Sequence, residues 1–359
     1  LTYYNLSDRI DWKFGFYHFG QEIYDEQVIE YDNGDYVEWV PTIRYQTLGI
    51  NIKPSFPINK FQRFDFGLDF TEYSKQELTW TTMYDYTEEN VAGYKKRFLM
   101  PFVQYNYDNT LWQETYPVKG KRIYFKYMSS ILNKNLQSPD FYSFSFDMRA
   151  YSSMKNRVST AIRLFGGHLG GPDVYRATFR TGGTTYLPFF SDEHTQAQYE
   201  LYYDIHDSED QIYYNQYVMP IRGIPVGAKV GKNVLLMNAE VRLPFLMYYF
   251  PAIGFLGKIN AVLFSDLGVI WDNEFPNISA ASNWDEDLTL SNGYSIYQNF
   301  LGENQERIMA PGGWVWTFGF GPRFILLGMP WQVDFAWQYN PIIHEFSSRR
   351  WYISIGLDF

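Results

Sequence analysis

Large apolar side chains alternate with polar ones in segment after segment of this chain. The last nine residues, WYISIGLDF (351–359), place Trp351, Ile353, Ile355, Leu357 and Phe359 on one face and mostly polar or small residues on the other. A period of two residues is that of a β-strand whose two faces meet different surroundings. The alternation therefore predicts an all-β fold.

Charged residues share the polar face of these segments. The segments RFDFGLDF (63–70), FYSFSFDMRA (141–150), GWVWTFGFGPRF (313–324) and WQVDFAWQYN (331–340) each set large, mostly aromatic side chains against a face that contains Asp or Arg. A soluble sandwich also alternates, but its strands are shorter and its outer face favours Thr, Lys and Glu. Aromatic faces in segments of about ten residues are typical of transmembrane barrels.

Aromatic residues make up 20% of the chain, with 32 Tyr, 30 Phe and 11 Trp, although the chain is polar on average. Such amphipathic rings accumulate at membrane interfaces. A run of about 18 apolar residues, which a membrane-spanning helix needs, does not occur. The nearest, FLMYYFPAIGFLG (245–257), is interrupted by Pro251 and Gly254. Because a closed sheet is the other way to satisfy backbone groups in lipid, we expect a transmembrane antiparallel β-barrel of about 16 strands.

We expect residues 1–359 to form a single barrel domain, because neither a linker nor an internal repeat is visible. The first residue is Leu1 rather than Met, and no signal peptide precedes it, so we expect a processed or truncated product. The strands near 234–247, 257–271, 313–325, 330–340 and 350–359 are the clearest. Strand boundaries within 1–93 are the least defined.

The charge distribution argues against a nucleic-acid partner. The net charge is −10, and neither Lys nor Arg occurs within 181–221 or 271–306. Phosphate binding requires clustered cations, so these two segments are expected to be acidic loops. The absence of cysteine is compatible with an oxidising compartment.

Sequence motifs for metal binding or catalysis are missing. The five histidines (His18, His168, His194, His206 and His344) lack the spacing of metal ligands, and the acidic segments 204–210 and 283–288 lack that of a calcium loop. We interpret both segments as solvated loops. Neither G-x-S-x-G nor a phosphate-binding loop occurs, so we expect no metal, no cofactor and no enzymatic activity.

Two neighbouring strands place carboxylates on the same polar face. Alternation puts Asn238, Glu240 and Arg242 on the polar face of 234–247, and Lys258, Asn260 and Asp266 on that of 258–268. Arg222, in the Pro- and Gly-containing loop MPIRGIPVG (219–227), is the first cation after a long stretch without one. A guanidinium can bridge two carboxylates with its fork of donors. We therefore predict that Arg222 folds inward and pairs with Glu240 and Asp266.

These motifs carry a family resemblance. The order GG (182–183), IRGI (221–224), NAEVRLPF (238–245), FSDLG (264–268) and a final strand ending in Phe359 resembles the C-terminal half of the BamA-type outer-membrane assembly barrels, also called the bacterial surface antigen superfamily. The segment DNTLWQETYPVKGKR (108–122) is loosely similar to the Asp–Pro–Gly–Arg stretch of that family. The resemblance covers the chain from Asp108 to Phe359.

The resemblance implies a role for each motif residue. It implies a C-terminal barrel domain of 16 strands in which an Arg-Gly loop, here Arg222 and Gly223, meets one acid on each of the two following strands, here Glu240 and Asp266. Gly182, Gly183, Phe264 and Gly268 would be further motif residues, and Phe359 would be the C-terminal strand signal.

This sequence also departs from the family pattern. Ile221 and Ile224 stand where many members have Val and an aromatic residue, and about forty residues separate the glycine pair from Arg222 where many members have few. The longer spacing implies an enlarged surface cap.

The resemblance implies a multi-pass protein of the bacterial outer membrane that inserts, assembles or translocates proteins there. Its partners would be outer-membrane lipid, client outer-membrane proteins, and periplasmic or lipoprotein partners. The alternative is a non-catalytic membrane anchor or plugged pore for a partner protein or domain, because these residues include none of the repeated periplasmic domains with which assembly members receive clients. A diffusion porin is a weaker third interpretation, because the loop of Arg222 would obstruct the lumen.

Overall fold

The computed structural model describes residues 2–5, 9–24, 27–30, 36–81, 87–113, 116–130, 139–153, 158–174, 177–183, 214–218, 220–224, 229–243, 259–276, 313–340, 344–347 and 349–355. Several residues singled out above lie outside these ranges: His194, His206, Pro251, Gly254, Lys258, Leu357, Phe359 and the acidic segments 204–210 and 283–288.

The chain forms two compact units. The first comprises Leu1–Gln104, Tyr127–Tyr142 and Gly171–Asp173, and the second comprises Tyr105–Lys126, Ser143–Gly170 and Val174–Phe359. The secondary-structure elements of the described residues are β-strands, and most of them belong to one 16-stranded sheet. The all-β prediction with about 16 strands is therefore confirmed. Within the described part of the chain, no helix is long and apolar enough to cross a membrane.

The first unit contains antiparallel strands, several of which are long. They are β1 (Thr2–Asn5), β2 (Asp11–Tyr24), β3 (Gln27–Glu30), β4 (Tyr36–Asn59), β5 (Gln62–Thr81) and most of β6 (Thr87–Asp108). β4, β5 and β6 contain 24, 20 and 22 residues, twice the length predicted from the alternation. At about 3.3 Å per residue, such strands are far longer than an apolar band of about 25 Å, so only part of each can lie in hydrocarbon.

In the first unit, large apolar side chains of β2, β4 and β5 are exposed, whereas Asp65 and Lys75 are buried. The exposed face of β2, β4 and β5 carries Trp12, Phe14, Phe16, Ile50, Ile52, Phe56, Phe64, Phe66 and Leu68. On the other face, Asp65 is 0% exposed and pairs with Nζ of Lys53 at 3.2 Å. A soluble protein distributes its side chains the other way round. This inversion is expected of strands with lipid on one side and a polar interior on the other.

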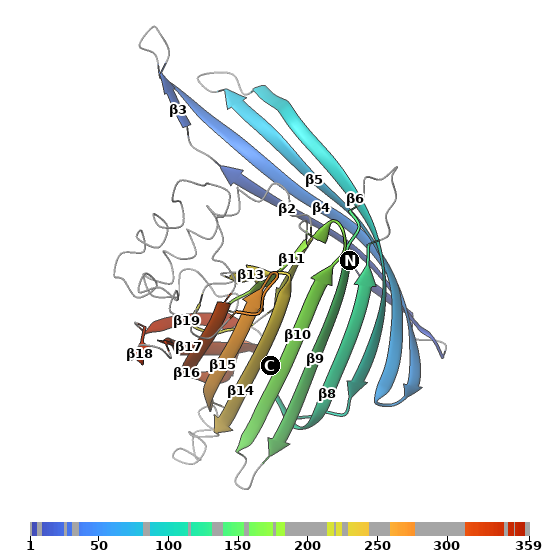
Figure 1. Cartoon of the computed structure of the whole chain (residues 1–359), viewed down its shortest axis with the longest axis vertical. Helices are drawn as coiled ribbons and strands as arrows, with labels where there is room; N and C mark the ends of the chain where they lie inside the picture. Colours follow the sequence, from blue (N-terminus) through green and yellow to red (C-terminus); the bar gives the residue numbers. More distant parts are fainter. Residues whose placement is uncertain are drawn as a thin grey trace. The chain divides into compact units, whose positions relative to one another are not determined.

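The second unit contains the C-terminal part of the large sheet. Its strands are β7 (Leu111–Gln113), most of β8 (Tyr116–Ser129) and of β9 (Tyr142–Ser153), β10 (Ser159–Gly170), β14 (Asn233–Leu243), β15 (Asn260–Trp271), β16 (Gly313–Leu326), β17 (Met329–Asn340), β18 (Glu345–Phe346) and β19 (Arg350–Ile355). From β10 the order runs β14, β15, β16 and β17, and both β18 and β19 pair with β17. Figure 1 shows β10 and β14 as antiparallel neighbours. The predicted C-terminal strands thus correspond to β14–β17 and β19.

A small second sheet was not predicted from the sequence. In it, β11 (Ala177–Thr181) pairs in parallel with β12 (Tyr214–Val218) and antiparallel with β13 (Lys229–Gly231). The ring of Phe179 lies over Gly167 of β10, and Gly231 packs against Ile270 of β15. The small sheet therefore covers the inner face of the strands that flank the candidate site.

Candidate functional site

The pairing register of β14 and β15 determines which side chains form the site. Asn238 lies opposite Asp266 in this antiparallel pair, and both side chains are buried, as is that of Glu240. On the opposite face, Met237 is 44% and Leu263 is 49% exposed. Because side chains alternate strictly along a strand, one register places Asn238, Glu240 and Asp266 on a common inner face.

The segment Pro220–Ile224 lies against this inner face and is fully buried. The N–H of Ile221 donates to the carbonyl of Gly182 at 2.6 Å, and the N–H of Gly183 donates to the carbonyl of Ile224 at 3.0 Å. A Cβ at Gly183 would collide with that carbonyl of Ile224. The glycine pair thus holds the backbone on both sides of Arg222.

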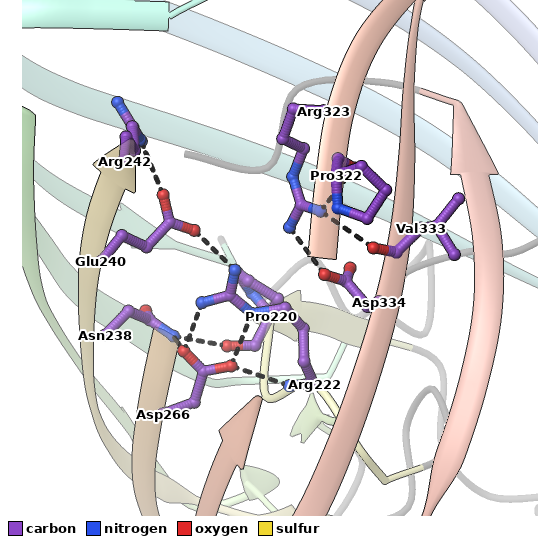
Figure 2. A network of polar contacts seen from close by, with 10 residues as sticks. All are labelled: Pro220, Arg222, Asn238, Glu240, Arg242, Asp266, Pro322, Arg323, Val333 and Asp334. Atoms are coloured by element: carbon purple, nitrogen blue, oxygen red, sulfur yellow. Dashed lines mark hydrogen bonds and ion pairs between the residues drawn. The ribbon is translucent and has the colours of Figure 1, made fainter. Parts of the chain in front are cut away.

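Arg222 is 0% exposed and is bonded to both predicted acids. Its backbone N–H and its Nε donate to Oδ2 of Asp266 at 2.9 and 2.8 Å, and its Nη2 donates to Oδ1 at 2.7 Å. Its Nη1 donates to Oε1 of Glu240 at 2.5 Å. Figure 2 shows the guanidinium between the two carboxylates.

Two more side chains complete the polar network around Arg222. Nδ2 of Asn238 donates to Oδ1 of Asp266 and to the carbonyl of Pro220, both at 2.8 Å. Arg242 pairs with the second oxygen of Glu240 at 2.8 Å and donates to the carbonyl of Pro117 at 3.0 Å. The two guanidinium groups and two carboxylates therefore balance in charge, which burial requires.

The remaining motif residues shape the space around the loop. The guanidinium of Arg222 lies 3.8 Å from the ring centroid of Phe264, a favourable cation–π distance. Gly268 lies against the side chain of Ile221, and a Cβ at this position would collide with Cδ1 of that residue. The glycine of FSDLG thus leaves room for the isoleucine of IRGI.

Gly223 contacts three further strands. Its φ is +93°, a conformation that glycine adopts without strain. A Cβ at Gly223 would lie 2.9 Å from Cβ of Ala336 on β17 and 3.6 Å from Cγ2 of Thr317 on β16. Its carbonyl accepts a hydrogen bond from Nη1 of Arg350 on β19 at 2.9 Å. Arg350 was not among the predicted residues, although alternation from Tyr352 and Ser354 places it on the inner face.

A second ion pair lies near the loop. Nη2 of Arg323 on β16 pairs with Oδ1 of Asp334 on β17 at 2.7 Å, as Figure 2 shows.

The segment 108–122, which is loosely similar to the Asp–Pro–Gly–Arg stretch of the family, contains an ion pair between its two ends. There Oδ2 of Asp108 accepts from Nε of Arg122 at 2.9 Å, and Gly120 has a φ of +110°.

The arrangement is suited to fixing a loop in place. Within the described residues, no group of three or more His, Asp or Glu side chains is placed to hold a metal ion. Removal of one partner from a buried ion pair typically costs about 3–5 kcal/mol, because the other charge remains buried without compensation. The predicted residues Gly182, Gly183, Arg222, Gly223, Glu240, Phe264, Asp266 and Gly268 all lie in this one cluster.

The fold is similar to those of two solved outer-membrane proteins. No protein-family model matches the sequence, and no curated protein matches it. The structure of BamA from Haemophilus ducreyi lacking POTRA domains 1–3 matches with a TM-score of 0.50 and 10% identity, over 99% of this chain and 68% of that chain. CdiB from Acinetobacter baumannii matches with a TM-score of 0.50 and 13% identity, over 100% of this chain and 49% of that one. This chain therefore spans about two thirds of the BamA chain and half of the CdiB chain.

The fold is that of the 16-stranded outer-membrane β-barrels. More narrowly, it is the barrel fold shared by BamA and CdiB, over nearly the whole chain and at low sequence identity.

Proposed function

We propose that this chain is a barrel of the bacterial outer membrane that inserts, assembles or translocates client proteins, with the Arg222 loop locked to its inner wall. Its lipid-facing surface would be the exposed apolar face of the strands. The expected partners are outer-membrane lipid, client outer-membrane proteins, and periplasmic or lipoprotein partners.

The observation that carries this proposal is the engagement of both acids by Arg222. The guanidinium reaches Glu240 on β14 and Asp266 on β15, and it is fully buried. The family resemblance implies an Arg-Gly loop whose arginine meets one acid on each of the two following strands, and these contacts of Arg222 support that interpretation. The similarity of fold to BamA and CdiB supports the same interpretation.

Client strands would pair with an edge of the sheet. β1 is the first strand in the sheet order, and its residues Thr2–Asn5 pair with Trp12–Gly15 of β2. N–H and C=O groups along the edge of a sheet can bind an extended client segment by β-augmentation.

The test is to deplete the protein from its bacterium and replace it with variants. We expect depletion to lower the amounts of folded outer-membrane proteins, and Arg222→Ala to restore them poorly. The double variant Glu240→Gln, Asp266→Asn should fail in the same way. Glu72→Gln, which alters an exposed pair with Arg97, is the matched control and should restore assembly fully.

A membrane anchor or plugged pore is the second candidate, and the extent of the loop contacts favours it. A loop that touches β14, β15, β16, β17 and β19 would block leakage even without clients. Unchanged amounts of outer-membrane proteins after depletion would favour this candidate. A large, steady conductance of the purified chain in a planar bilayer would contradict both the anchor with a plugged lumen and the locked loop.

A further inference from the structure

We propose that Arg350 makes the terminal strand β19 part of the Arg222 lock, so that the loop and this strand can be released only together. The consequence for client assembly rests on the proposed function, whereas the coupling itself is a property of the fold.

Arg222 and Gly223 contact different strands of the sheet. The side chain of Arg222 points to β14 and β15, where Glu240 and Asp266 hold it. The next residue, Gly223, packs against Thr317 of β16 and Ala336 of β17. Two successive residues of one loop therefore touch four neighbouring strands.

The pairing register of β19 with β17 places Arg350 next to the loop. Arg350 lies opposite Ala336 in the antiparallel pair of β17 and β19, next to the point where Gly223 contacts β17. Its side chain is on the inner face and the residue is 3% exposed. From there, Nη1 donates to the carbonyl of Gly223 at 2.9 Å. The loop is thereby tied to a fifth strand, 127 residues away in sequence.

The hydrogen bond from Arg350 to Gly223 supplements a short ladder between β17 and β19. β19 pairs with β17 through Trp331–Ala336, a short ladder next to the long ones of β14, β15 and β16. A charge-assisted hydrogen bond from a buried guanidinium is stronger than an ordinary one, and its loss leaves a buried cation with fewer acceptors. The bond between Arg350 and Gly223 therefore ties β19 to the loop in addition to its ladder with β17.

The adjacent residue provides a matched control. Arg349 carries the same side chain but is exposed, with its guanidinium 5.8 Å from the ring centroid of Phe335. Substitution at 349 changes the net charge and the local sequence as substitution at 350 does. The substitution at 349 leaves the hydrogen bond between Arg350 and Gly223 in place.

The experiment is hydrogen–deuterium exchange of the full chain in lipid nanodiscs, read on peptides that cover 220–224 and 350–355. We expect Arg350→Met to raise exchange in both segments by at least about tenfold, the lower end of the range that corresponds to one lost charge-assisted hydrogen bond. Arg350→Lys retains a donor and should restore part of the protection. Arg349→Met should leave both segments unchanged. Unchanged exchange at 220–224 in Arg350→Met would overturn the proposal, because Arg350 would then stabilise only its own strand.

The reciprocal variant tests the coupling if Arg350→Met does not fold. Asp266→Asn loosens the loop from β15, two strands away from β17, and should raise exchange at 350–355. Protection at 350–355 equal to that of the unaltered chain would overturn the proposal. Client assembly is measured separately. Coupled exchange without any assembly defect on depletion would remove the proposed function alone, and an assembly defect with uncoupled exchange would remove the coupling alone.

Discussion

Arg222 binds Asp266 through its backbone as well as its side chain. The backbone N–H, Nε and Nη2 of Arg222 all donate to this one carboxylate, at 2.9, 2.8 and 2.7 Å. Asp266 thus orients the peptide unit of the loop and the guanidinium at the same time. Glu240 receives a single bond from Arg222 and is also paired with Arg242. The two acids are therefore not equivalent.

This difference predicts that Asp266→Asn is more damaging than Glu240→Gln. Loss of the Asp266 charge leaves Arg222 with one anionic partner, and we expect it to lower the free energy of unfolding by about 3–5 kcal/mol. For Glu240→Gln, the amide oxygen can still accept from Arg222, and we expect a loss of about 1–3 kcal/mol. Denaturant unfolding of the chain in lipid vesicles measures both. Equal losses for the two variants would contradict the unequal roles.

Arg222→Lys tests the fork geometry of the lock. Lysine keeps the positive charge and the backbone bond to Asp266, but it cannot reach both carboxylates in one plane. We expect this variant to expose the loop to an added protease that does not cut the unaltered chain. Cleavage within 219–227, mapped by mass spectrometry, is the readout. Protection equal to that of the unaltered chain would show that charge alone holds the loop.

Gly268→Ala tests the contact between FSDLG and the loop. A methyl group at 268 collides with Cδ1 of Ile221, and we expect a destabilisation of about 1–3 kcal/mol. Ile221→Val removes that Cδ1 atom, so the double variant should recover much of the loss. Gly20→Ala is the control, because a Cβ there meets no atom within 4 Å. A double variant no better than Gly268→Ala would place the cause elsewhere.

The strict period of β-strands explains how much of the site the sequence could predict. The alternation in the sequence predicted that Asn238, Glu240 and Asp266 lie on the polar faces of their strands. In the structure the three side chains lie on one inner face of the sheet. The bond from Arg350 to Gly223 could not be predicted, because it depends on which strand lies next to β17 and on how deep the loop extends. The same holds for the small sheet, where β11 pairs with strands that are distant in sequence.

The lengths of the N-terminal strands could not be predicted from the sequence. Alternation marks the part of a strand that has two chemically different surroundings, and it predicted segments of about ten residues. β4 contains 24 residues, and its exposed Leu48, Ile50, Ile52, Phe56 and Ile58 follow the membrane pattern. Backbone pairing with β5 reaches back to Trp39, well before these residues, so the sequence alone could not define the ends of the strand.

The lipid-facing surface can be tested with a pair of adjacent positions. The chain contains no cysteine, so a single introduced thiol can be labelled selectively. Leu68 is on the exposed apolar face of β5, and Asp69 is on the other face, where it accepts a hydrogen bond from the hydroxyl of Tyr17 at 3.3 Å. We expect a fluorophore at Leu68→Cys to be quenched severalfold more strongly by lipids with brominated acyl chains than one at Asp69→Cys. Equal quenching at both positions would contradict the membrane orientation.

The most direct test of the lock is a double-mutant cycle between Arg222 and Asp266. Arg222→Met, Asp266→Asn and the double variant are compared by their free energies of unfolding in lipid vesicles. We predict that the double variant loses less than the sum of the single losses, by about 1.5–3 kcal/mol, because each single variant already breaks the shared bonds. Losses that add to within about 0.5 kcal/mol would contradict the account, because the two residues would then act independently.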